Sequence, residues 1–148
     1  MRSRGVARKR AKGETPVSIR LEPVLLGAVR GRARREGKPV SRVIREMLSE
    51  AVRMQRFPGV VVVEGPAGRR AHLAGTGLDV WELIGLVREY GSPASLREHF
   101  PHLSPRAIQV AIAYAEEYPE EINAFLEANT RGEDRLRQEV PWLETVRS

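Results

Sequence analysis

The sequence contains no cysteine, which excludes disulfides, thiolate metal sites and cysteine nucleophiles. Lysine is also scarce: only Lys9, Lys12 and Lys38 stand among the 25 basic residues, a skew that fits either a GC-rich coding sequence or recognition by guanidinium groups. No apolar run approaches the roughly 20 residues of a membrane span, and the basic N-terminus lacks the apolar stretch of a signal peptide. We therefore expect a cytoplasmic protein.

The composition is typical of a folded protein, and its basic charge indicates binding to a polyanion. With 148 residues, 41% of them hydrophobic and 30% charged, the chain is long enough for one ordinary domain or two small ones. Residues 1–56 hold 16 Lys and Arg against 5 Glu, a formal charge of +11. Residues 57–148 hold 9 Arg against 14 acidic residues, a charge of −5. This asymmetry indicates a nucleic-acid-binding segment joined to a part with another role.

Residues 1–14 have almost nothing apolar to bury, and we expect a flexible basic arm. Its Arg10 and Lys12 are candidates for contacts with phosphates or a minor groove, and the alternative is a solvated tail without specific contacts. From Pro16 the pattern changes, because apolar Val17, Ile19 and Leu21 alternate with Ser18 and Arg20 as in a short strand. A strand needs a hydrogen-bonded neighbour, and a second protomer would supply it.

Two helices are predicted after this strand. The first opens at Glu22–Pro23 and ends before Gly37, a left-handed cap. Its predicted buried residues are Leu25, Leu26, Val29 and Ala33, and its predicted outward residues are Arg30, Arg32, Arg34 and Arg35. The second helix runs from about Pro39 to Met54. Its apolar face is wide, which indicates burial both by the first helix and by a dimer mate; the face comprises Val40, Val43, Ile44, Met47, Leu48 and Ala51.

The segments Pro16–Leu21 and Gly37–Ile44, with this order of elements, resemble the ribbon-helix-helix family of repressors and antitoxins. The resemblance implies a swapped dimer whose paired strands enter the DNA major groove, with Ser18 and Arg20 against base edges. It also implies a phosphate held by the amides of Val40 and Ser41. The remaining candidate DNA contacts of this module are Thr15, Lys38 and Arg42. Pro16 stands where the family has a third base-reading side chain, so Thr15 or Lys12 would compensate; the alternative is a ribbon that serves only dimerisation.

Phe57-Pro58-Gly59 marks a domain boundary. A hairpin is predicted beyond it, with strands at 60–64 and 69–73 around a turn at 65–68. Helices are predicted at 78–90, 93–100, 105–118 and 120–127, and the second and third of these look like a helix-turn-helix.

Four stretches of this half, at residues 74–81, 90–93, 100–108 and 111–115, resemble the domain-of-unknown-function 433 (DUF433) family over residues 57–126. The resemblance implies a small winged-helix-like fold found in antitoxins of PIN-type toxin pairs. Arg106 and Gln109 are candidate DNA contacts at the start of the third helix. The glutamates that follow from residue 116 would repel phosphate, so we favour protein contact or dimerisation over DNA contact here.

We therefore predict a mainly α protein of four segments: a basic arm at 1–14, a ribbon-helix-helix module at 15–56, a DUF433-like domain at 57–128 and a tail at 129–148. In the tail, Trp142 and Leu143 are predicted to bind a partner protein, with folding back onto the chain's own core as the alternative. No arrangement for catalysis, metal or cofactor binding is evident. The expected function is a homodimeric, operator-binding regulator and antitoxin. The alternative is an architectural or segregation protein that coats DNA with weak sequence preference.

Overall fold

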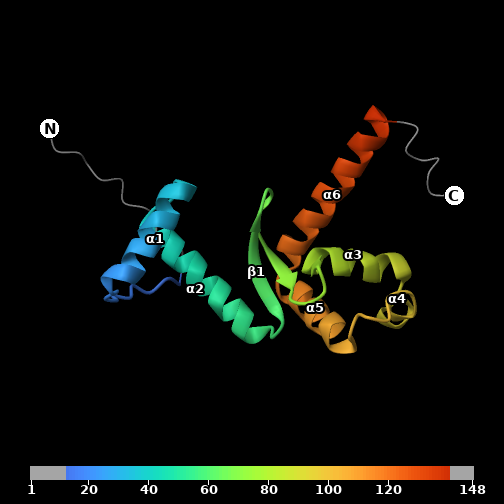
Figure 1. The fold of residues 1–148 in the computed structure, drawn as a ribbon, viewed down its shortest axis with the longest axis horizontal. Coiled ribbons are helices and arrows are strands. Elements are labelled where there is room, and N and C mark those ends of the chain that lie inside the picture. The colour runs from blue at the N-terminus through green and yellow to red at the C-terminus, as the bar shows by residue number, and fades with distance from the viewer. Residues whose placement is uncertain (1–12, 141–148) are drawn as a thin grey trace. The chain divides into compact units, whose positions relative to one another are not determined.

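A computed structural model describes residues 13–140 of the chain. This part is mainly helical, with six helices and a small three-stranded antiparallel sheet, which confirms the expected mainly α class (Figure 1). It divides between Arg45 and Glu46 into two compact units, which are described separately. No helix within the described residues is long and apolar enough to cross a membrane.

The first unit contains helix α1 (Pro23–Glu36) and the beginning of helix α2 (Val40–Arg56). Pro23 stands in the first turn of α1, where its missing N–H leaves no helical hydrogen bond unmade. Gly37 ends the helix with a φ of 62°, a left-handed conformation that favours glycine. The N–H of Lys38 then donates to the Ala33 carbonyl at 3.0 Å, as in a Schellman-type cap. Both predicted ends of α1 are confirmed.

A small core joins α1 to the start of α2. Val29, Ala33 and Val43 are buried, and Val40 and Ile44 pack against them. The core is narrower than predicted, because Leu25 is 49% exposed. Among the arginines predicted to face outward on α1, Arg32 is largely covered instead, since its Nε donates to Glu36 Oε1 at 2.8 Å.

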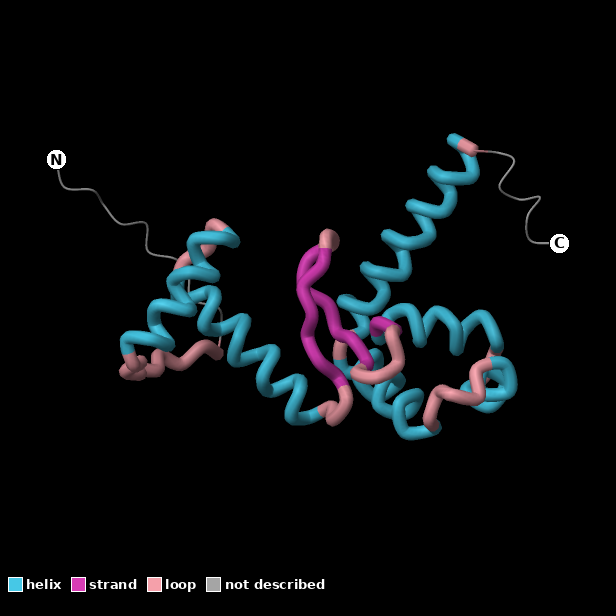
Figure 2. Tube along the Cα trace, in the orientation of Figure 1, coloured by secondary structure: helices cyan, strands magenta, loops and turns pink. Residues whose placement is uncertain are grey.

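The sheet of the second unit consists of strands β1 (Val60–Gly65), β2 (Gly68–Leu73) and β3 (Leu78–Asp79), in that order. The β1–β2 hairpin (magenta in Figure 2) and its turn are as predicted. Its register is continuous from Val60 opposite Leu73 to Gly65 opposite Gly68. The predicted helix from residue 78 is wrong by two residues, because Leu78 and Asp79 pair with β2 before helix α3 begins.

Four helices complete the second unit: α3 (Val80–Tyr90), α4 (Pro93–His99), α5 (Pro105–Glu117) and α6 (Pro119–Glu139). Gly91 caps α3 with a φ of 82°, and Ser104 caps α5 by accepting from the Ala107 N–H at 3.1 Å. The predicted end of the last helix at residue 127 is wrong, because α6 continues for twelve further residues.

One hydrophobic core holds the sheet and these helices together. Tyr114 and Leu73 are its largest fully buried side chains. The other buried members are Phe57, Val60, Ala71, Val80, Leu83, Ile84, Leu96, Leu103, Ile108, Ala111 and Ile122. From about residue 127 onward, α6 leaves this core and every side chain to Glu139 is exposed.

Candidate nucleic-acid interface

The segment predicted as a DNA-reading ribbon, Pro16–Leu21, forms neither helix nor strand in the single chain. A strand exists only through hydrogen bonds to a neighbouring strand, and the single chain offers this segment none within its described residues. Val17 and Ile19, predicted as its buried face, are 80% and 55% exposed. Ser18 and Arg20 are exposed as predicted, and so is Thr15. The segment thus leaves both of its faces open to a partner.

Helix α2 also presents an apolar face that the single chain leaves uncovered. Of its side chains only Val43 is buried, whereas Leu48 is 59% exposed. On the same helix Met47, Val52 and Met54 are exposed as well. Exposed apolar side chains at helical spacing are typical of a surface that another protein covers.

The start of α2 is the predicted phosphate site. The carbonyl of Pro39 accepts hydrogen bonds from the N–H groups of Arg42 and Val43, at 3.1 and 3.2 Å. Within the described residues, the N–H groups of Val40 and Ser41 make no backbone hydrogen bond, and their place in the first turn is where an anion is favoured. The Ser41 and Arg42 side chains are exposed beside them.

Lys38, a predicted DNA contact, has a carboxylate beside it. Its Nζ lies 3.1 Å from Glu36 Oε2, while Arg32 bonds the other oxygen of the same carboxylate. The hydrogen bonds from Arg32 and Lys38 lower the pKa of Glu36 below its ordinary value, the Arg32 bond having the larger effect. Lys38 therefore brings less free positive charge to a phosphate than the sequence implied.

The remaining candidates fall elsewhere. Arg106 and Gln109 are exposed near the start of α5 in the second unit. Four predicted contacts, Arg10, Lys12, Trp142 and Leu143, lie outside the described residues.

The arginines at the end of α2 hold the second unit together. Arg53 Nη1 donates to the Tyr114 hydroxyl and to Glu121 Oε2, both at 3.0 Å, and its guanidinium lies 4.0 Å from the centroid of the Tyr118 ring. Burial, followed by the hydrogen bond to Glu121, raises the pKa of Tyr114 well above its ordinary range. We conclude that the positive charge of Arg53, which counts toward the +11 of residues 1–56, stabilises the fold of the second unit.

Two further arginines of residues 46–73 also form ion pairs within the second unit. Arg56 Nη1 lies 3.0 Å from Glu117, and Arg69 forms a two-pronged ion pair with Glu50. Arg53, Arg56 and Arg69 are thus each held by a glutamate of the second unit.

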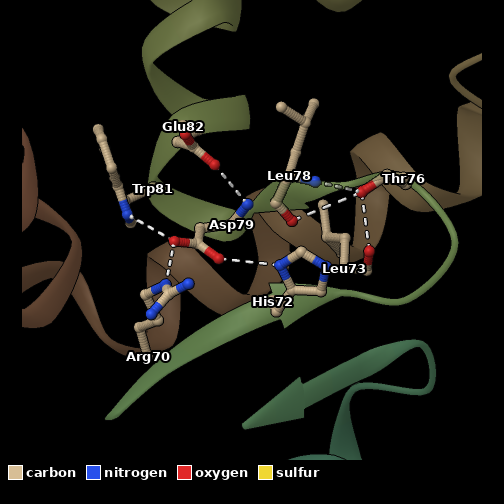
Figure 3. A network of polar contacts seen from close by, with 8 residues as sticks. All are labelled: Arg70, His72, Leu73, Thr76, Leu78, Asp79, Trp81 and Glu82. Carbon is tan, nitrogen blue, oxygen red and sulfur yellow. Dashed lines mark hydrogen bonds and ion pairs between the residues drawn. The ribbon is translucent and has the colours of Figure 1, made fainter. Parts of the chain in front are cut away.

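A second polar network fixes the start of α3 (Figure 3). The carboxylate of Asp79, which is 6% exposed, accepts from Arg70 Nε and from Trp81 Nε1 at 3.2 Å, and lies 2.9 Å from His72 Nδ1. Glu82 accepts the Asp79 N–H at 2.7 Å. The Asp-x-x-Glu spacing at the start of a helix is the local signal that could have indicated this arrangement. These contacts join strand β2, through Arg70 and His72, to the start of α3.

Residues 60–115 match the model of a family described as "Protein of unknown function (DUF433)". This confirms the DUF433 resemblance over that segment, which spans the sheet and helices α3 and α4 and most of α5. The match does not extend to the ribbon-helix-helix resemblance of residues 16–44. No curated protein and no solved structure matches the chain.

Proposed function

We propose that this chain is a homodimeric, sequence-specific DNA-binding regulator, and that it is the antitoxin of a type II toxin–antitoxin pair that represses its own operon. The observation that carries the DNA-binding part is the state of Pro16–Leu21. Of its alternating apolar side chains Val17 and Ile19 are exposed and Leu21 is half-buried, and its backbone lacks a strand neighbour among the described residues. Pairing with the same segment of a second copy would satisfy both.

In such a dimer Val17, Ile19 and Leu21 face the helices, and Ser18 and Arg20 face outward. A two-stranded ribbon fits the major groove, where the Arg20 guanidinium can donate two hydrogen bonds to the O6 and N7 atoms of a guanine. The exposed apolar side chains of α2 supply a surface for the second copy's helices. The amides of Val40 and Ser41 then hold a phosphate that sets the position of the ribbon.

The toxin-binding part rests on the second unit. The sequence resemblance to DUF433 implies an antitoxin-like role for this unit, and the charge of −5 over residues 57–148 complements a basic partner such as a PIN-like toxin. The second half of α6 carries charged side chains on all sides and is clear of the core. It leads directly to Trp142 and Leu143, the predicted partner-binding pair.

Gel shifts with the DNA upstream of the gene and with unrelated DNA of equal length test the DNA-binding proposal. Stronger binding to the upstream DNA at the same salt concentration supports a repressor. Equal binding to both favours the architectural alternative, and binding to neither contradicts both.

Co-purification with the product of the neighbouring gene tests the antitoxin proposal. The full chain should retain that protein, and a version ending at Val140, which keeps all of α6, should lose it. Equal recovery by both versions would remove Trp142 and Leu143 from the interface, and no recovery by either would contradict the antitoxin role.

A further inference from the structure

Strand β1 has one edge that no described strand covers. It stands first in the order β1-β2-β3, so only its other edge pairs with β2. Its residues Val60–Val63 are four consecutive valines with high β-propensity. Natural edge strands usually avoid association through Lys, Pro or a β-bulge. Residues 60–64 include no Lys or Pro. The strand also has no β-bulge there, because its register with β2 is unbroken.

The hairpin geometry identifies the backbone groups that face this open edge. The Ala74 N–H donates to the Gly59 carbonyl at 2.9 Å, so Gly59 and Ala74 form a hydrogen-bonded pair. In an antiparallel ladder such pairs alternate, which assigns Val61 and Val63 to bonding with β2. The polar groups of Val60, Val62 and Glu64 therefore point away from the sheet.

The Val60 N–H is already used, because it donates to the Phe57 carbonyl at 2.9 Å. The outward N–H and carbonyl of Val62 and of Glu64 make no backbone hydrogen bond to any residue in the range 13–140. The open groups are thus the N–H of two residues and the carbonyls of three.

From this pattern we propose that β1 pairs antiparallel with β1 of a second copy of the chain, which joins two three-stranded sheets into one of six strands. The two-fold axis lies at Val62. Each Val62 N–H donates to the Val62 carbonyl of the other copy, and each Glu64 N–H donates to the other copy's Val60 carbonyl. The Val60 N–H, which already donates to the Phe57 carbonyl, is not needed for this pairing.

The side chains favour a second copy in this register. Val61 lies opposite Val63 of the other copy, and Val62 lies opposite itself, so the centre of the interface consists of β-branched side chains. The two Glu64 carboxylates are four strand positions apart, about 13 Å. An axis at Glu64 would place these like charges opposite each other, and an axis at Val60 would require the N–H that Phe57 holds.

This interface does not depend on the proposed ribbon. Where the ribbon also pairs, the two interfaces together link dimers into larger assemblies, and several copies bound side by side on DNA would favour the β1 contact by raising its effective concentration.

The absence of cysteine in the chain allows a register-specific test. Val61→Cys and Val63→Cys chains are made separately in the full-length protein, then mixed and oxidised mildly. Residues 61 and 63 of different copies then lie directly opposite, with Cβ atoms about 5 Å apart, so the mixture should form a disulfide-linked dimer. Each variant alone should cross-link poorly, because two copies of the same residue lie diagonally. Cross-linking that is equal in the mixture and in the single variants overturns the proposal, and so does none at all.

Sedimentation of Val63→Lys gives a second measurement with the sheet intact. Two added ammonium groups beside the two-fold axis should abolish the β1 contact. This loss should reduce larger assemblies to the ribbon dimer, and a dimer joined through β1 alone to the single chain. Leu136→Lys, which adds the same charge on the exposed half of α6, is the matched control and should sediment as the unmodified chain does. To separate this contact from the ribbon, the Val63→Lys and Leu136→Lys measurements are repeated in chains that also carry Ile19→Asp. That change should break the ribbon contact alone. A mass unaffected by Val63→Lys in both backgrounds contradicts the proposal.

Discussion

The hydroxyl of Tyr114 donates a hydrogen bond to Glu121 Oε2 at 2.7 Å and accepts one from Arg53 Nη1 at 3.0 Å. Three helices meet at this one oxygen, because Arg53 belongs to α2, Tyr114 to α5 and Glu121 to α6. The Tyr114 ring is fully buried, and Phe57 packs edge-on against it with ring centroids 5.2 Å apart. The end of α2 is thereby part of the second unit's core.

Tyr114→Phe keeps the ring and removes only this oxygen. We expect the free energy of unfolding to fall by about 1–3 kcal/mol, since both lost hydrogen bonds involve charged partners that are partly shielded from water. Chemical denaturation of the two proteins measures the difference. Glu117→Gln is the control: it removes only the negative charge opposite Arg56, at a pair that is half exposed, and should cost about 0.5 kcal/mol or less. Equal effects of the two changes would contradict the role of the Tyr114 hydroxyl.

The ion-paired Glu36 predicts a pH dependence of the first unit. Because Arg32 and Lys38 lower the pKa of Glu36 in the folded chain, its stabilising effect is fully present above its ordinary value of 4.5. The effect is lost as the pH falls through the lower folded-state pKa. Glu36→Gln should therefore melt below the unmodified chain at neutral pH, with the gap closing in acid. Thermal melts over a pH series measure this, and a gap that is constant with pH would refute it.

Asp79→Asn should destabilise the second unit. The change withdraws the negative charge from Arg70 and from the start of α3 while it keeps the side-chain shape. We expect a loss of about 2–3 kcal/mol in the free energy of unfolding, less than for a fully buried pair because Arg70 is partly exposed. Asp134→Asn makes the same chemical change on the exposed half of α6 and should have little effect. A similar loss from both would show that the Asp79 network is not specific.

The features that the sequence predicted well depend on neighbouring residues. The Gly37 cap and the Ser104 cap each follow from one residue's conformational or hydrogen-bonding preference, and the β1–β2 hairpin follows from the apolar run at 60–63 and the glycine-containing turn after it. The family resemblance over residues 60–115 likewise rests on contiguous stretches.

The features that it missed depend on distant residues or on summed weak terms. Nothing local in Arg53 indicates that it meets Tyr114, 61 positions away. The length of α6 was missed because Asn129 and Gly132 disfavour a helix. Pairs spaced by four residues offset them, such as Asn129 with Glu133 and Arg135 with Glu139. The predicted strand at Pro16–Leu21 is a different case. It would form only by pairing with a second chain, so the structure of a single chain does not contain it.

The central claim, that Arg20 reads a base, is tested most directly by measuring the affinity of Arg20→Ala for the upstream DNA and for the same DNA with each base pair changed in turn. Arg34→Ala, an exposed arginine near the end of α1, is the matched control for lost charge. We predict that Arg20→Ala loses about 1–3 kcal/mol of discrimination at one position of each half-site, while Arg34→Ala leaves the base preferences unchanged. A uniform loss of affinity for all sequences with Arg20→Ala would contradict base reading and favour a protein that coats DNA.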